Sequence, residues 1–256
     1  MQPMTLMFQV ANVDLSRMQY VGTFEETYDL PAGDVQTLAR RHMETPLGHV
    51  LIYPSVFPGT VTLNMTNITG VDGTNAQDLT RAAITTRRQT VTVLNFLREH
   101  VPGFENAYIL KTASQVGVRE TRHFKGLYTL TEHDVLAARV FDDWAVANAH
   151  FNFDVHNLTG SGLDETGVQK HFSQPKGYTI PYRCFVPEAI DGLLLAGRCI
   201  SGTHLAHANF RVMPICANMG QATGIAAALC VQQGIEPRQL DVGQLQRVLS
   251  GHGVQP

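Results

Sequence analysis

The amino-acid sequence predicts an α+β fold, and three observations carry this prediction. Short apolar runs typical of strands alternate with amphipathic helical patterns over most of the chain. One helical pattern, from about Ala76 to His100, is much longer than the others. Glycine and alanine become frequent after Gly192, which indicates that a second structural unit begins there. With 44% hydrophobic and only 16% charged residues, the chain has the composition of a well-buried globular protein.

The first part of the chain predicts three strands and a short helix. Thr5 to Val13 is an apolar run that reads as a core strand, and Asp34 to Met43 is an amphipathic helix that stops before Pro46. His49 to Phe57 and Thr60 to Met65 predict two strands around a Pro-Gly turn. A chain that starts almost directly with a core strand suggests that the preceding part of the fold is supplied elsewhere.

The long helix has the clearest pattern. Apolar residues recur at helical spacing, Thr74 or Asn75 can cap its start, and Pro102-Gly103 ends it. After it we expect strands at 107–111, 115–119 and 126–130. A helix follows that opens at Thr131 and includes Asp142, Asp143 and Trp144. The remaining expected elements are a strand at 150–155, a polar loop at 157–167, and a strand-like segment at 177–186 that contains Pro181.

The last quarter is the most informative stretch. Gly192 to Ser201 predicts a buried strand and a glycine turn, and Arg211 to Gly224 predicts a helix that begins at Pro214 and is lined with small residues. The first turn of such a helix presents unpaired N–H groups and a positive dipole end, which suit an anionic or electron-rich ring system. Gly220 and Gly224, one turn apart, leave room for a close approach. A short amphipathic helix, 240–249, ends the chain.

The net charge, the start of the sequence and the cysteines indicate which partners and which compartment to expect. A net charge of −3 without a polybasic face makes nucleic acid an unexpected partner, and no uninterrupted apolar run predicts a membrane span. The start lacks the basic region of a signal peptide. The four cysteines form no CxxC pair and are expected to be reduced. We therefore expect a cytoplasmic protein.

A series of motifs in order along the chain resembles the family of FAD-dependent oxidoreductases, in which a Rossmann-type FAD domain carries an inserted substrate domain. The matching stretches are Gly117-Val-Arg-Glu-Thr-Arg122, Gly126-Leu-Tyr-Thr-Leu-Thr131, Phe153-Asp-Val-His-Asn157, Tyr178-Thr-Ile-Pro-Tyr-Arg183, Ala196-Gly-Arg-Cys-Ile-Ser201, Thr203-His-Leu-Ala-His207 and Arg211-Val-Met-Pro214. The resemblance implies an oxidoreductase with FAD as cofactor and a small organic substrate.

The chain departs from the family in one respect. The resemblance implies a GxGxxG turn that holds the FAD pyrophosphate, and the sequence contains none; Gly160-Ser-Gly162 lacks the third glycine. The chain therefore resembles only the C-terminal part of a family member, as one subunit of a split enzyme or a piece of a longer protein. We expect a second chain that supplies the N-terminal FAD-binding half, or a homo-oligomer. The expected domains are a substrate domain (1–186), the C-terminal part of a Rossmann-like FAD-binding domain (187–236), and a C-terminal helix and tail (237–256).

The resemblance also assigns residues to the cofactor. A turn beneath the ribityl and phosphate groups corresponds to Ala196, Gly197 and Arg198. Arg211 stands before the cofactor helix, and the backbone of its start would face the flavin pyrimidine edge. The residues of this helix expected to bind the cofactor are Val212, Met213, Pro214, Ile215 and Gly220.

Five residues are candidates for catalysis. His204 and His207 lie between the cofactor strand and helix, where a histidine can move protons near neutral pH. His156 follows Asp154, which can orient its ring, although a buried structural histidine fits equally well. Tyr182 and Arg183 are expected to face the flavin, with the guanidinium available for a substrate carboxylate or keto oxygen, or for an ordinary ion pair.

The remaining histidines and two alternative functions complete the expectations. His123, His133, His171 and His252 are expected at the surface. The spacing of His204 and His207 also suits metal ligation, but no third ligand stands at a standard spacing, so no metal is expected. The leading hypothesis is the flavin-facing part of an oxidoreductase that transfers hydride between substrate and flavin. The alternatives are a non-catalytic partner subunit of a split flavoprotein and a metal-dependent hydrolase built on His156, His204 and His207.

Overall fold

The computed structural model describes residues 1–164 and 176–256, which form two compact units. The first unit holds residues 1–121 and 156–164, and the second holds residues 122–155 and 176–256. Helices and strands are mixed in both units, which confirms the predicted α+β class. The division into domains 1–186, 187–236 and 237–256 stays a prediction, because the compact units are separated by packing and not by function.

The first unit is built on a four-stranded antiparallel sheet. Its strand order is β4-β5-β1-β6, with bounds Ile52–Pro54 (β4), Val61–Leu63 (β5), Phe8–Ala11 (β1) and Tyr108–Thr112 (β6). β1 pairs with β5 in a register that places Phe8 opposite Leu63, and both side chains enter the core. A two-stranded ribbon, β2 (Asp29–Leu30) and β3 (Gly33–Asp34), precedes the first helix. The strands predicted at 5–13, 49–57 and 60–65 exist but are shorter than expected, the one at 107–111 is confirmed as β6, and the one predicted at 115–119 is wrong, because only an isolated bridge at Gly117 forms there.

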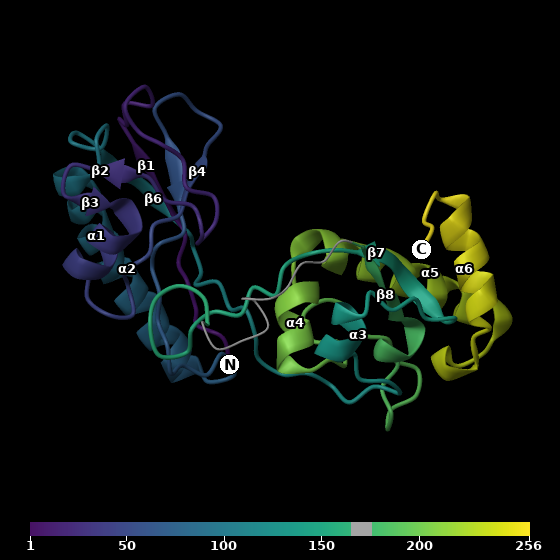
Figure 1. The fold of residues 1–256 in the computed structure, drawn as a ribbon. Helices are drawn as coiled ribbons and strands as arrows, with labels where there is room; N and C mark the ends of the chain where they lie inside the picture. The colour runs from purple at the N-terminus through teal and green to yellow at the C-terminus, as the bar shows by residue number, and fades with distance from the viewer. Residues whose placement is uncertain (165–175) are drawn as a thin grey trace. The chain divides into compact units, whose positions relative to one another are not determined.

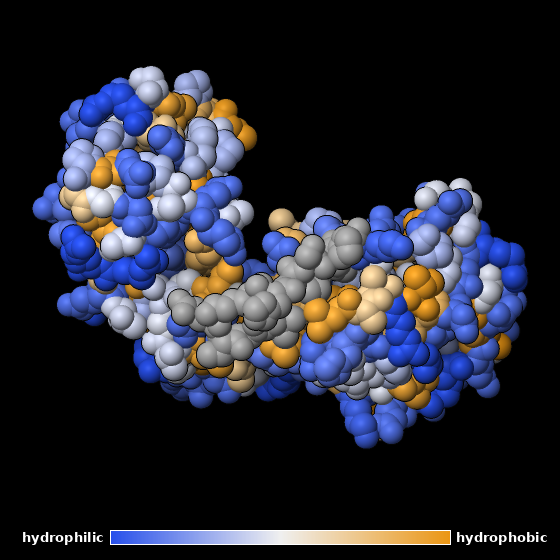
Figure 2. All heavy atoms as spheres, viewed as in Figure 1, coloured by the Kyte–Doolittle hydropathy of each residue, from blue (hydrophilic) through white to orange (hydrophobic). Residues whose placement is uncertain are grey.

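Helices α1 (Val35–His42) and α2 (Ala76–His100) pack into the same core together with residues of the connecting loops, and both confirm the sequence prediction. Asp34 caps α1 through a bond from Thr37 N, and Asn75 caps α2 through bonds from Gln77 N and Asp78 N. In Figure 1 both helices lie beside the sheet of the first unit. Apolar side chains nevertheless remain on the surface of both units, as the orange patches of Figure 2 show.

In the second unit, the segment from Thr131 to Ala149 differs from the prediction. Thr131 opens α3 with a capping box, as expected, but α3 spans only Glu132–Leu136. Ala138 then adopts a positive φ of 46°, which a continuing helix does not permit. The predicted helix through Trp144 is therefore wrong, because residues 144–149 form strand β7 (Trp144–Ala149) against β8 (Tyr178–Pro181). The strand predicted at 150–155 is also wrong, since β7 ends before it.

Three helices complete the second unit. They are α4 (His204–Phe210), α5 (Met213–Gln233) and α6 (Val242–Gly251), with short 3₁₀ turns at Tyr182–Cys184 (η2) and Pro237–Gln239 (η3). Helix α5 contacts β7 and α6, and its inward residues join the core of the unit. The predicted proline-started helix and the terminal helix are thus confirmed.

The buried strand predicted at Gly192–Ala196 is wrong for this chain. These residues form no strand, and Leu193 is 37% exposed. A single backbone bond, from Leu195 N to Phe185 O, ties the segment to the described chain. A strand needs a neighbour to pair with, and no described strand lies beside this segment.

Candidate functional site

Two successive helix starts shape the region that the sequence assigns to the cofactor. Thr203 caps α4 by accepting a hydrogen bond from Ala206 N. Helix α4 ends at Phe210 with Arg211 as its C-cap, and α5 begins at Met213 with Val212 as its extended N-cap and Pro214 in its first turn. Because proline is pre-set for this position, the sequence fixes where α5 begins.

The N-terminus of α5 has no side-chain cap. Val212 has no polar side chain, and no hydrogen bond from a capping side chain forms there. The N–H groups of the first turn therefore carry the positive end of the helix dipole without a protein partner among the described residues. Such a start can accept the electron-rich edge of a ring or an anion.

Arg198 and the glycine turn before it lie close to this helix start. Burial raises the pKa of the Cys216 thiol in the first turns of α5, while the neighbouring charges of Arg198 and Arg211 lower it. Gly197 has a φ of +90°, a conformation that favours glycine, and a Cβ there would meet no atom within 4 Å. The structure thus places the turn at Ala196–Arg198 and the start of α5 in one region.

One face of α5 is bare. A Cβ added at Gly220 or at Gly224 would meet no atom of the described chain within 4 Å. These glycines line a groove of about 540 Å³ together with Leu194, Ala227 and Val231. Val231 is 83% exposed, although it lies in a strongly apolar helix. The close approach that the glycine spacing predicts is therefore sterically possible.

The length and composition of α5 would allow it to cross a membrane, and 28% of its most apolar window is buried. It is the one such helix among the described residues. Core helices of water-exposed enzymes have the same composition when a neighbouring layer covers them. The exposed face of α5 is thus apolar and uncovered among the described residues.

Arg211 is held in place by an acidic partner. Its Nη2 donates to the backbone oxygen of Asp154 at 3.0 Å and forms an ion pair with the Asp154 carboxylate. The side chain of Arg211 is 11% exposed and that of Asp154 is 25% exposed. This pair joins the residue before α5 to the segment that follows β7, so Arg211 helps fix the helix start.

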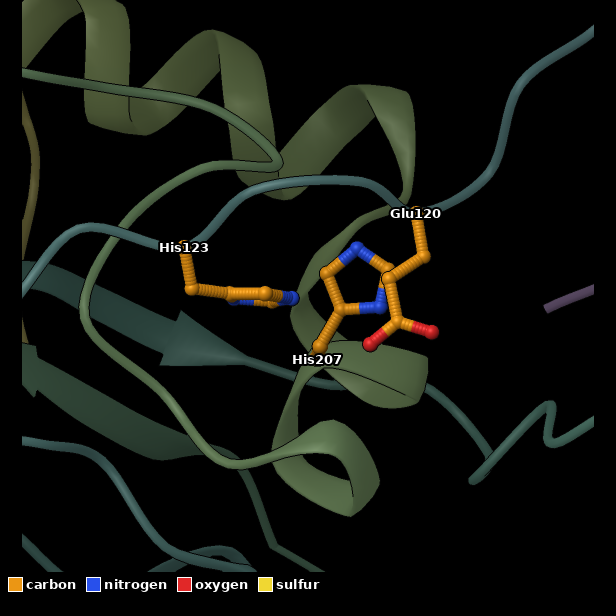
Figure 3. A group of neighbouring side chains, drawn as sticks. All are labelled: Glu120, His123 and His207. Carbon is orange, nitrogen blue, oxygen red and sulfur yellow. The ribbon is translucent and has the colours of Figure 1, made fainter. Parts of the chain in front are cut away.

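The two histidines of α4 have different surroundings. His204 is the first residue of the helix and is half-buried, whereas His207 is fully buried. The ring of His207 packs edge-on against Phe210 and against His123, at centroid distances of 5.5 and 4.8 Å. Figure 3 shows the perpendicular arrangement of the two imidazole rings.

His123 is therefore a residue that the sequence analysis misplaced at the surface. It is half-buried, and its Nδ1 lies 3.4 Å from Ile200 O. Charged residues on either side, Arg122 and Lys125, gave no sign of this contact. His133 and His252 are exposed as expected, and His171 lies outside the described residues. Glu120, also labelled in Figure 3, belongs to the first unit, where its carboxylate accepts a hydrogen bond from Gln2 N.

His156 lies in the first unit and so is not grouped with the other catalytic candidates. It is 4% exposed, and its ring meets Phe24 edge-on at 5.4 Å. Phe24 also packs on His49, a second buried histidine that the sequence analysis did not single out. Burial, reinforced by the charge of His156, lowers the pKa of His49 to about 4. The apolar run after His49 was the available signal that this ring is buried.

Tyr182 and Arg183 line a different cavity from Gly220. The Tyr182 hydroxyl donates to Pro237 O at 3.0 Å, and burial raises the pKa of this phenol. Arg183 binds the Asp143 carboxylate through two nitrogens, at 2.8 and 3.2 Å, and the hydrogen bond to Asp143 raises its pKa. None of the residues expected to bind the cofactor lines this second cavity.

These observations test whether the residues present fit the flavin end of FAD. An uncapped helix start and a left-handed glycine turn belong to the second unit, and the bare face at Gly220 and Gly224 lies further along the same helix. They provide the donors and the space that a large electron-rich ring requires. His204, His207, Tyr182 and Arg183 lie in the same unit, and the role of each stays a prediction.

Comparison with known proteins points in the same direction. A family model described as FAD dependent oxidoreductase matches residues 1–249. No curated protein and no solved structure matches the chain.

Proposed function

Since the chain belongs to the FAD dependent oxidoreductase family, we propose that it is the flavin-facing and substrate-binding part of a split or longer enzyme of this family. FAD is the cofactor, and the reaction class is oxidation–reduction. The observation that carries the finer proposal is the α5 start, which has free N–H groups and a bare glycine face behind it.

The residues of the second unit have separate tasks in this proposal. The backbone of Val212–Ile215 binds the pyrimidine edge of the flavin, and the positive end of α5 favours the negative charge that reduction places there. The turn at Ala196–Arg198 supports the ribityl and phosphate groups. Arg211, fixed by Asp154, keeps the helix start in position.

Bound FAD supplies the hydride chemistry for a small organic substrate. The chain supplies orientation and proton transfer. His204 is the best-placed group for moving a proton, because it is half-buried at the start of α4 and not enclosed like His207. Arg183, His156 and Tyr182 remain further candidates for substrate contact.

The open face of α5 supports the proposal that this part is completed by another protein segment. The groove beside Gly220 and Gly224, together with the exposed Leu193, offers an apolar surface that a neighbouring layer would bury. A second chain or a further part of the polypeptide with a GxGxxG turn provides such a layer and also holds the FAD pyrophosphate. We place the enzyme in the cytoplasm, which suits its four free cysteines.

Anaerobic reduction of the assembled enzyme tests this proposal. We expect the flavin absorbance to bleach on addition of an organic substrate and to bleach at least about 100-fold more slowly in His204→Gln, the usual scale for a positioned acid–base group. Arg247→Gln, which alters a 71% exposed side chain, serves as the matched control. Wild-type bleaching rates in His204→Gln would reject the role of this residue. An assembly with FAD bound only by its partner would favour the alternative of a non-catalytic subunit.

A further inference from the structure

The first unit contains buried polar side chains that the flavin proposal does not use. Gln2 and Asn67 are each 1% exposed, and His49 is 5% exposed. Each has one side-chain atom that meets no hydrogen-bond partner within residues 1–164 and 176–256: Gln2 Nε2, His49 Nδ1 and Asn67 Oδ1. Nearly all buried polar atoms of folded proteins are hydrogen-bonded, so three exceptions in one unit indicate a place where a ligand can bind.

The ring of His49 offers an acceptor. Its Nε2 lies 3.1 Å from Asn64 O, and because a carbonyl oxygen only accepts, Nε2 carries the proton. Burial lowers the pKa of His49 to about 4, so the ring is neutral near neutral pH. In a neutral imidazole the second nitrogen has a lone pair and no hydrogen. His49 Nδ1 therefore accepts a hydrogen bond from any donor that reaches it.

The two amides add one donor and one acceptor. Gln2 Oε1 accepts a hydrogen bond from His156 N at 3.4 Å, which leaves Nε2 as a donor. Asn67 Nδ2 donates to Pro46 O at 3.2 Å and to Gly160 O at 3.3 Å, which leaves Oδ1 as an acceptor. Both amide orientations are fixed by these partners, since a flipped amide would set donor against donor or acceptor against acceptor.

The three side chains are held by the same few segments. His49 reaches Asn64 O and Asn67 reaches Pro46 O, so residues 46–49 run beside residues 64–67. Three residues of extended chain span at most about 11 Å, which one small molecule can bridge. Gln2 joins this group through the backbone of His156, four residues before the Gly160 that Asn67 binds.

Phe24 covers the two buried histidines. The centre of its ring lies 5.2 Å from that of His49 and 5.4 Å from that of His156. Phe24 itself is half-buried, and the residues on either side of it are exposed. Near this ring the hydrogen bonds are local, between Thr23 and Glu26. The ring can therefore turn away without breaking a strand pair, and this would open the histidines to a ligand.

The mixture of donors and acceptors selects the chemistry of the ligand. A hydroxyl group both donates and accepts, so hydroxyl groups can satisfy all three atoms. A carboxylate only accepts, and it would leave His49 Nδ1 and Asn67 Oδ1 without a donor. An ammonium group only donates, and the positive charge of Arg119, which acts on His49, would repel it.

We propose that the first unit binds a neutral polyhydroxylated molecule, with its hydroxyl groups on His49 Nδ1, Asn67 Oδ1 and Gln2 Nε2 and with the Phe24 ring as its lid. The inference goes beyond the proposed flavin reaction, because all four residues belong to the first unit and none is assigned to the cofactor.

Nitrogen NMR of the imidazole rings in the full chain tests this site without flavin or activity, because Nδ1 of a neutral ring shifts when it accepts a hydrogen bond. The probes are xylitol, glutarate and cadaverine, which share a five-carbon chain. We expect xylitol to shift the Nδ1 resonance of His49 and both other probes to bind at least about 10-fold more weakly, the scale of about one hydrogen bond. The exposed His133 and His252 should not shift.

Two variants test the acceptor and the lid by calorimetry. His49→Gln should weaken xylitol binding by at least about 10-fold, since it removes the ring acceptor. Phe24→Ala should bind xylitol at least as tightly as the unchanged chain and exchange it faster. Phe57→Ala, which alters a 65% exposed ring on the β4–β5 turn, serves as the matched control and should change neither.

The other outcomes overturn the proposal. An unmoved Nδ1 resonance in excess xylitol would mean that His49 meets a buried water only. Equal binding of glutarate would mean that the two acceptors recognise nothing, and equal binding of cadaverine would mean that the charge of Arg119 does not count. Weaker binding or slower exchange in Phe24→Ala would contradict the lid. Should His49→Gln lower the thermal midpoint, the Nδ1 shift in the unchanged chain still decides.

Discussion

Replacement of Gly220 should move the stability of the chain and its flavin binding in opposite directions. A Cβ at this position meets no atom within 4 Å, so an alanine methyl group brings the chain itself no steric strain. Glycine costs a helix interior about 1 kcal/mol relative to alanine. Gly220→Ala should therefore stabilise the isolated chain by about 1 kcal/mol, which raises the midpoint by about 2–4 °C for a protein of this size.

The same change should damage the assembled enzyme. If flavin or a covering layer approaches α5 at Gly220, the larger Gly220→Val side chain should overpack this contact at a cost of about 1–3 kcal/mol. The assay is thermal unfolding of the isolated chain beside FAD content of the assembly, with Gly251→Ala near the end of α6 as a control in open space. A fall in the midpoint of the isolated chain, or full FAD content in the Gly220→Val assembly, would refute this reasoning.

Three further outcomes follow from the structure. The folded pKa of His49, about 4, lies below the unfolded value of 6.5, so neutral His49 contributes stability above pH 6.5 that is lost as the pH falls through 4. Urea unfolding should show that His49→Gln removes about 3 kcal/mol of this pH dependence, and an unchanged slope between pH 4 and 6.5 would contradict it. His207→Gln should lower the free energy of unfolding by about 1–3 kcal/mol, since the ring is fully buried; calorimetry showing an unchanged midpoint would place it outside the core. Asp154→Asn and Arg211→Gln should show a coupling of about 0.5–3 kcal/mol in a double-mutant cycle, and additive effects would mean that the ion pair does not fix the α5 start.

The elements with strong local signals could be predicted from sequence. Helix α2 has apolar periodicity, an asparagine cap and a Pro-Gly end, and α5 has Pro214 at its start, so both were located correctly. The prediction for the region after Thr131 was wrong because its apolar residues suit either a helix or a strand. Pairing with β8 and the positive φ of Ala138 decided the outcome, and neither is a local property of the sequence.

The candidate site divides in the same way. The turn at Gly197 and the start of α5 were recognisable because glycine and proline mark backbone geometry directly. The environments of His123 and His49 could not be recognised from the sequence. Burial of a histidine depends on partners distant in sequence, here His207 and Phe24. At Gly192–Ala196 the local pattern predicted a strand that does not form, since an apolar run forms no strand without a neighbour.

The FAD content of the isolated 256-residue chain, compared with that of the native assembly, tests the central claim most directly. The flavin-facing helix start is present in the chain, whereas the GxGxxG turn for the pyrophosphate is not. We expect the chain alone to be nearly colourless when purified at micromolar concentration, and the assembly to carry one FAD for each copy of the chain. One tightly bound FAD on the isolated chain would contradict the account.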